Sequence, residues 1–145
     1  MKGFITSLAL LIIITSFTEN NCEKCDIQKV KAVDDHLNSL TYQIVSDFIC
    51  TFDSTCKTNV EYSEWSNEIL FKVLDKSPGI FFQVITKEKV DDKQLLNEIE
   101  NPILDFDFQT IYDKIKTVAA SPDLKQKYLN ALIVAASKDG INIKK

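Results

Sequence analysis

The chain has 145 residues, enough for one hydrophobic core and too few to leave room for a second ordinary domain. Seventeen basic residues against 21 acidic ones give a formal net charge of −4 at pH 7, and every basic residue is a lysine. The acidic balance argues against nucleic acid as a partner, as does the lack of guanidinium groups, which phosphate and base-edge recognition favour.

The first 18 residues have the pattern of a secretory signal peptide. Lys2 supplies the positive start, an apolar run extends from Phe4 to Phe17, and polar Glu19 follows. The run is shorter than the roughly 20 residues of a membrane-spanning helix. We therefore expect no membrane span, a signal peptide at residues 1–18, and a single helical domain at residues 19–145. This mature domain would be periplasmic, attached to the cell surface or secreted.

A long first helix is predicted between two pairs of cysteines. Apolar residues recur there at intervals of three or four: Ile27, Val30, Val33, Leu37, Leu40, Ile44, Phe48 and Phe52. Neither proline nor glycine interrupts the pattern. It predicts one helix over about residues 26–50, with a length of about 36 Å.

The four cysteines, Cys22, Cys25, Cys50 and Cys56, are expected to form two disulfides, because exported thiols usually oxidise. A disulfide needs Cα atoms within about 7 Å of each other. An unbroken helix would hold the clusters too far apart, which favours the local pairs Cys22–Cys25 and Cys50–Cys56. A break near residues 34–35 or 38–39 would permit crossed pairs. Lipid attachment at Cys22 is disfavoured, because lipoprotein processing prefers a small residue where Asn21 stands.

Five further helices are predicted from local start and stop signals. Residues 58–61 have the spacing of a capping box and open a helix that runs to about residue 76. Ser77-Pro78 opens the next, although residues 80–85 would also suit a buried strand. Asp91 and Asp107 are interpreted as caps of helices over 92–101 and 107–118. Ser121-Pro122 opens the last helix, with Gly140 as its C-terminal cap.

These elements define an all-α fold of about six helices with a long first helix. The two Ser-Pro junctions lie 44 residues apart, from Ser77 to Ser121, which is within the period of HEAT and armadillo repeats. The sequence thus leaves two architectures open, an irregular helical bundle or HEAT-like stacked helical hairpins.

No combination of residues indicates an active site. The single histidine, His36, follows Asp35, but neighbours on a helix point about 100° apart and cannot form a general-base pair. The spacing of Cys22 and Cys25 is that of a redox or zinc motif, but the expected strand–helix setting is missing. We therefore expect a protein that is not an enzyme and that binds neither a metal nor another cofactor.

Neighbouring aromatic residues give the only indication of a contact surface. Phe81 and Phe82, and likewise Phe106 and Phe108, point in directions that cannot all face one core. They are candidates for contact with a partner, although burial between adjacent helices is the favoured interpretation.

The leading functional hypothesis is a small exported interaction module, such as an inhibitor, an immunity protein or an accessory subunit. Its protein partner is unidentified. The alternative is a carrier of an apolar small molecule, suggested by the nine phenylalanines. A cavity lined by Phe and Ile would favour the carrier, and a solid core with an exposed apolar patch would favour the interaction module.

Overall fold

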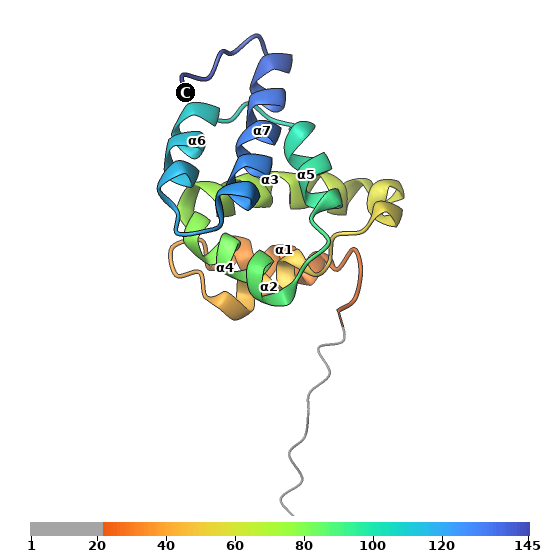
Figure 1. The fold of residues 1–145 in the computed structure, drawn as a ribbon. Helices are drawn as coiled ribbons and strands as arrows, with labels where there is room; N and C mark the ends of the chain where they lie inside the picture. Colours follow the sequence, from red (N-terminus) through yellow and green to blue (C-terminus); the bar gives the residue numbers. More distant parts are fainter. Residues whose placement is uncertain (1–21) are drawn as a thin grey trace, which may run out of the picture.

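The computed structural model describes residues 22–145, so the predicted signal peptide at residues 1–18 lies outside the described part of the chain. Residues 22–145 form an all-helical fold without strands, as the sequence predicted (Figure 1). Its elements are α1 (Ile27–Asp35), α2 (Tyr42–Ile49), the 3-10 helix η1 (Ser54–Thr58), α3 (Val60–Lys76), α4 (Pro78–Glu88), α5 (Lys93–Glu100), α6 (Phe108–Thr117) and α7 (Pro122–Lys138).

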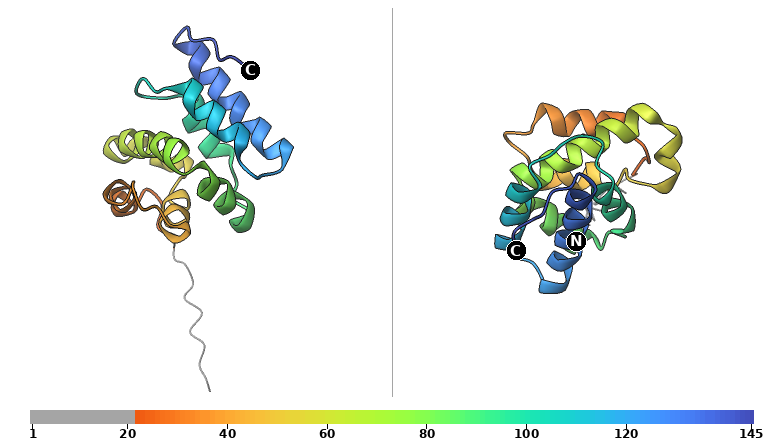
Figure 2. Two further views of the ribbon diagram at one scale, coloured as in Figure 1. Left: turned by 90° about the vertical axis from the view of Figure 1, so that its left-hand side faces the viewer. Right: turned by 90° about the horizontal axis from the view of Figure 1, so that it is seen from above.

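Helix α3 is the central element of the bundle. It contacts α1, α4, α5, α6 and η1, and it lies between a layer of α1, α2 and α4 and a layer of α5, α6 and α7 (Figures 1 and 2). The second layer is held together mainly by α7, which packs against both α5 and α6. The architecture is an irregular helical bundle, the first of the two that the sequence left open.

The predicted starts of the later helices are confirmed, but the predicted caps Ser77 and Asp91 are not: the Ser77 side chain makes no capping hydrogen bond, and Asp92, not Asp91, is at the N-cap of α5. The Oδ1 of Asn59, rather than the Thr58 side chain, accepts a hydrogen bond from the Tyr62 backbone N–H at 3.1 Å and caps α3. Asp107 and Ser121 cap α6 and α7 in the same way. Gly140 has a φ of +71°, the left-handed conformation that glycine adopts readily at the end of a helix.

The prediction of one long first helix is wrong. Helix α1 ends at Asp35, and α2 begins after Thr41, whose hydroxyl accepts a hydrogen bond from the Ile44 N–H at 3.3 Å. His36, Asn38 and Ser39 lie in the connection and are poor helix formers, so a capped second helix competes well there with continuation of the first. The two helices pack against each other as a hairpin, which lets both contribute apolar residues to one core.

The core is continuous and rich in aromatic side chains. The largest side chains with less than 2% exposure include Tyr62, Tyr128, Phe48, Phe71, Phe81, Phe82 and Phe108. Of the phenylalanines within residues 22–145, all but half-buried Phe106 are buried, so they pack in the interior instead of lining a cavity there. This packing leaves the surface, rather than the interior, as the place to look for a functional site.

Candidate functional site

Two crossed disulfides join the start of the described chain to the segment that follows α2. Cys22 pairs with Cys50 and Cys25 with Cys56, with Cα–Cα distances of 5.8 and 5.4 Å. All four cysteines are bonded, as expected, but the predicted local pairing is wrong. The physical reason is the break after α1, because the hairpin returns the chain to its starting point and brings the clusters within reach.

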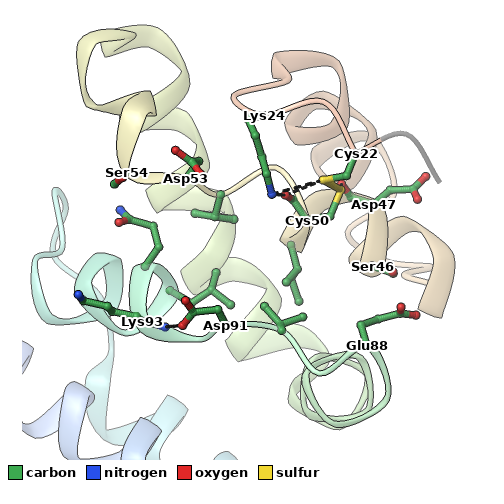
Figure 3. A pocket seen from close by; sticks show the side chains of 15 residues that line it. Cys22, Lys24, Ser46, Asp47, Cys50, Asp53, Ser54, Glu88, Asp91 and Lys93 are labelled. Carbon is green, nitrogen blue, oxygen red and sulfur yellow. Dashed lines mark hydrogen bonds between the residues drawn. A yellow bond between two sulfur atoms is a disulfide. The ribbon is translucent and has the colours of Figure 1, made fainter. Parts of the chain in front are cut away.

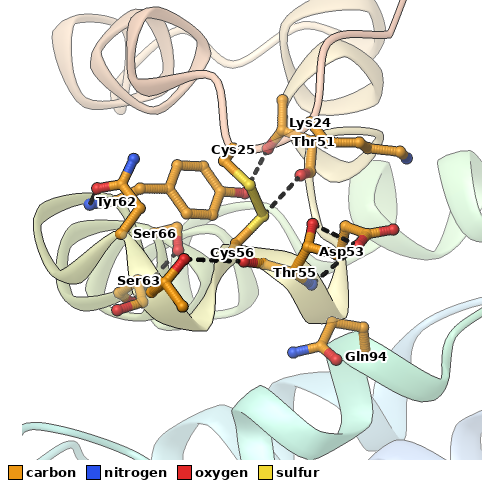
Figure 4. Close-up of a disulfide and its surroundings, with 12 residues drawn as sticks. Lys24, Cys25, Thr51, Asp53, Thr55, Cys56, Tyr62, Ser63, Ser66 and Gln94 are labelled. Carbon is orange, nitrogen blue, oxygen red and sulfur yellow. Dashed lines mark hydrogen bonds between the residues drawn. A yellow bond between two sulfur atoms is a disulfide. The ribbon is translucent and has the colours of Figure 1, made fainter.

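The inner disulfide is packed into the core. Cys56 is 4% exposed, and the backbone N–H of Cys25 donates to the Thr51 carbonyl at 2.9 Å (Figure 4). Nearby, the Tyr62 hydroxyl lies 2.6 Å from the Thr51 hydroxyl, which also donates to the Phe48 carbonyl. These bonds fix the segment after α2 at the base of α3.

The outer disulfide, Cys22–Cys50, forms part of the wall of a surface cleft of about 560 Å3 (Figure 3). A lipid on the Cys22 sulfur would be incompatible with this bond. Three segments that are distant in sequence form the cleft: the chain before α1, the region from α2 to η1, and the region from the end of α4 to the first turn of α5. The lining residues are Cys22, Lys24, Ser46, Asp47, Ile49, Cys50, Phe52, Asp53, Ser54, Glu88, Val90, Asp91, Lys93, Gln94 and Leu95.

The cleft has an apolar floor. Ile49, Phe52 and Leu95 are between 1% and 9% exposed and belong to the core, so their positions are fixed by packing beneath the cleft. Val90 is half-buried and adds a fourth apolar side chain from the connection between α4 and α5. Because Ile49 and Leu95 are almost fully buried already, most of the apolar side-chain surface that a bound group could cover belongs to Phe52 and Val90.

The rim of the cleft is charged. The Nζ of Lys24 reaches across the disulfide and donates to the Cys50 carbonyl at 2.5 Å (Figure 3). On the opposite side, Glu88 accepts a hydrogen bond from the Tyr42 hydroxyl at 2.5 Å, and this bond raises the pKa of Tyr42.

Asp53, at the edge formed by η1, is held by Thr55. The backbone N–H and the hydroxyl of Thr55 both donate to its Oδ1, at 2.9 and 2.8 Å, and these bonds lower the pKa of Asp53. The carboxylate is therefore ionised at neutral pH, and it keeps a fixed orientation at the rim.

The phenylalanines that were candidates for contact with a partner do not form an exposed surface. Phe81, Phe82 and Phe108 are at most 1% exposed, and half-buried Phe106 stacks on Phe71 with ring centroids 4.1 Å apart. Phe81 and Phe82 both meet Tyr128 edge-on at 5.2 Å. The side chains of Phe81 and Phe82 are both buried because helices cover α4 on more than one side. The expectation from the sequence assumed that only one face of each helix is covered.

The remaining titratable residues that drew attention in the sequence have structural roles. His36 is exposed, and its Nδ1 lies 2.8 Å from the Ala32 carbonyl. Asp34 and Asp35 pair with Lys72 and Lys31. Within residues 22–145, no group of three or more His, Cys, Asp or Glu side chains is placed to hold a metal ion.

The cleft residues Lys24, Glu88 and Asp91 were not singled out as site residues from the sequence. Lys24 lies before α1, whereas Glu88 and Asp91 lie around the connection from α4 to α5, and only the crossed disulfides and the packing of α2 on α4 bring these two segments together. A break in the first helix, combined with four cysteines, was the one signal that could have indicated their proximity.

Comparisons of the chain with known protein families, with curated proteins and with solved structures gave no match. Among the helices at residues 22–145, none combines the length and the apolar character needed to cross a membrane.

Proposed function

We propose that this chain is a small exported interaction module that docks a protein partner in the cleft beside the Cys22–Cys50 disulfide. An inhibitor, an immunity protein or an accessory subunit would fit this description. Export is supported by the apolar N-terminal sequence and by two disulfides, which persist in oxidising compartments.

The make-up of the cleft is the observation that carries this proposal. Its apolar floor, formed by Ile49, Phe52 and Leu95, is surrounded by charged side chains, and protein interfaces commonly combine an apolar centre with a polar rim. The Cys22–Cys50 disulfide ties two of its three walls together. A cleft that is ordered before binding avoids part of the entropy cost of association.

A carrier of a small molecule is the second candidate, because a volume of about 560 Å3 is in the range of small-molecule sites. The lining counts against an apolar ligand. Six of its side chains are charged residues: Lys24, Asp47, Asp53, Glu88, Asp91 and Lys93. The phenylalanines that motivated this hypothesis are mostly in the packed core.

A displayed random-peptide library, selected on the oxidised protein, tests whether the cleft is a docking site. Ser54 lies exposed at the rim, so Ser54→Trp should obstruct the cleft, whereas Ser137→Trp changes an exposed serine on α7 that is not part of the lining. We expect enriched peptides to bind the wild type and Ser137→Trp and to lose binding to Ser54→Trp. Peptides that bind all three proteins equally, or a selection without enrichment, would contradict the proposal.

A further inference from the structure

Negative charges outnumber positive charges around the cleft, and this excess indicates the charge of a partner that would fit there. Four carboxylates and two ammonium groups line the cleft. One carboxylate, Asp47, pairs with Lys29 outside the lining at 3.1 Å. The carboxylates of Asp53, Glu88 and Asp91 have no ion-pair partner among residues 22–145.

Hydrogen bonds within the described part of the chain orient these three carboxylates but engage only one of the two oxygens of each. Asp53 accepts both of its hydrogen bonds on Oδ1, Glu88 accepts one on Oε1, and Asp91 accepts one on Oδ1 from the backbone N–H of Lys93. Within residues 22–145, the second oxygen of each accepts no hydrogen bond. Each carboxylate therefore keeps an oxygen that can accept a charged donor from a bound partner.

The two lysines do not cancel this acidic character. Lys93 extends towards the outer edge of the cleft in Figure 3, away from the disulfide. Lys24 donates to the Cys50 carbonyl and to the Cys22 Sγ, and its ammonium keeps one further N–H group. A lysine that already binds one backbone carbonyl at this wall is suited to bind a carbonyl of an incoming peptide in the same way.

We propose that the cleft binds a peptide segment in which an apolar side chain is flanked by lysine or arginine. The apolar group would contact Phe52 and Val90 on the cleft floor, while the flanking cations would reach Glu88 and Asp91 around the connection between α4 and α5. This inference rests on the proposed docking function and names the chemistry of the segment that docks. The net charge of −4 for the whole chain would assist the approach of a basic partner.

Three capped hexapeptides test the charge preference. Each contains a central Leu-Phe pair flanked on both sides by Lys, by Gln or by Glu, and each is titrated into isotope-labelled oxidised protein while amide NMR shifts are recorded. We expect saturable shifts at cleft residues such as Ile49 and Leu95, with affinity in the order Lys, Gln, Glu. The Lys peptide should bind about tenfold more tightly than the Glu peptide at low salt, and this difference should shrink as salt screens the charges.

Matched charge variants separate local contacts from net charge. The double variant Glu88→Gln/Asp91→Asn removes two rim carboxylates, and Glu64→Gln/Asp123→Asn removes two exposed carboxylates that do not line the cleft. The first pair should weaken the Lys peptide about three- to tenfold and leave the Gln peptide unchanged, while the second should have little effect on either. Equal weakening by both pairs would show attraction by net charge alone and would overturn the inference.

The outcomes also separate this inference from the docking function. If the three peptides bind the cleft equally, or the Glu peptide binds best, the inference is wrong but docking stands. If none of them shifts the cleft amides while library-selected peptides do, the inference again fails alone. If no peptide of either origin binds the cleft, the docking function itself is contradicted.

Discussion

Removal of the hydroxyl from two buried tyrosines should have opposite effects on stability, although the chemical change is the same. Tyr62 and Tyr128 are at most 1% exposed, and both lie in the continuous core. The Tyr62 hydroxyl lies 2.6 Å from the Thr51 hydroxyl. The Tyr128 hydroxyl has no hydrogen-bond partner within residues 22–145.

The expected magnitudes follow from these surroundings. Tyr62→Phe deletes a buried hydrogen bond, but Thr51 keeps its bond to the Phe48 carbonyl, so the free energy of unfolding should fall by about 1 kcal/mol. Tyr128→Phe removes a buried hydroxyl that gains nothing in the fold, so the free energy of unfolding should rise by about 1 kcal/mol.

Urea unfolding of the two variants and the wild type at pH 7, followed by circular dichroism, measures this difference directly. The slopes should be equal, and the midpoints should move to opposite sides of the wild-type midpoint. If Tyr128→Phe destabilises the protein as much as Tyr62→Phe does, the Tyr128 hydroxyl has a partner, and the reasoning about the core on the α7 side is refuted.

Three further predictions concern a disulfide, a buried amide and alkaline pH. Cys22→Ser/Cys50→Ser opens a loop with a sequence separation of 28 and should lower the free energy of unfolding by about 3 kcal/mol. A decrease of less than about 1 kcal/mol, measured by denaturant titration, would contradict this. Asn67→Ala removes a buried amide that donates to the carbonyl of Glu98 at 2.9 Å and accepts from the N–H of Ile103 at 3.2 Å. In the same assay the free energy of unfolding should fall by about 2–3 kcal/mol, whereas Asn97→Ala, at an exposed position, should leave it almost unchanged. Burial raises the pKa of Tyr62 to about 12, so the stability that its neutral form contributes should be complete below about pH 10 and lost as the pH rises towards 12. In Tyr62→Phe, the free energy of unfolding should therefore decline less steeply with pH over this range than in the wild type. Equal slopes for the two proteins would refute the assignment.

The elements with local sequence signals could be predicted well. The Ser-Pro starts at Ser77 and Ser121, the cap at Asp107 and the left-handed Gly140 are each determined by a few neighbouring residues. The starts of α4 to α7 therefore fell close to their predicted positions.

The features that depend on distant contacts could not be predicted in this way. The apolar spacing at residues 27–52 is the same for one helix and for two helices that both face the core, so it did not reveal the break after Asp35. The disulfide pairing followed from that break, and the burial of Phe81 and Phe82 depends on the helices that surround α4. The cleft was missed because its three walls come together only through these same contacts.

Non-reducing peptide mapping of the oxidised monomer tests the crossed disulfides, on which the cleft and its proposed function depend. Cleavage after lysine separates Cys22, on a fragment that ends at Lys24, from Cys25, on residues 25–29, and leaves Cys50 and Cys56 together on residues 32–57. Crossed pairs predict one species in which all three fragments remain linked until a reductant is added, and a further cleavage before Asp53, which separates Cys50 from Cys56, should leave Cys22 linked to Cys50 and Cys25 linked to Cys56. A linked pair of the two short fragments, with residues 32–57 released separately, would show local pairing and would contradict the cleft.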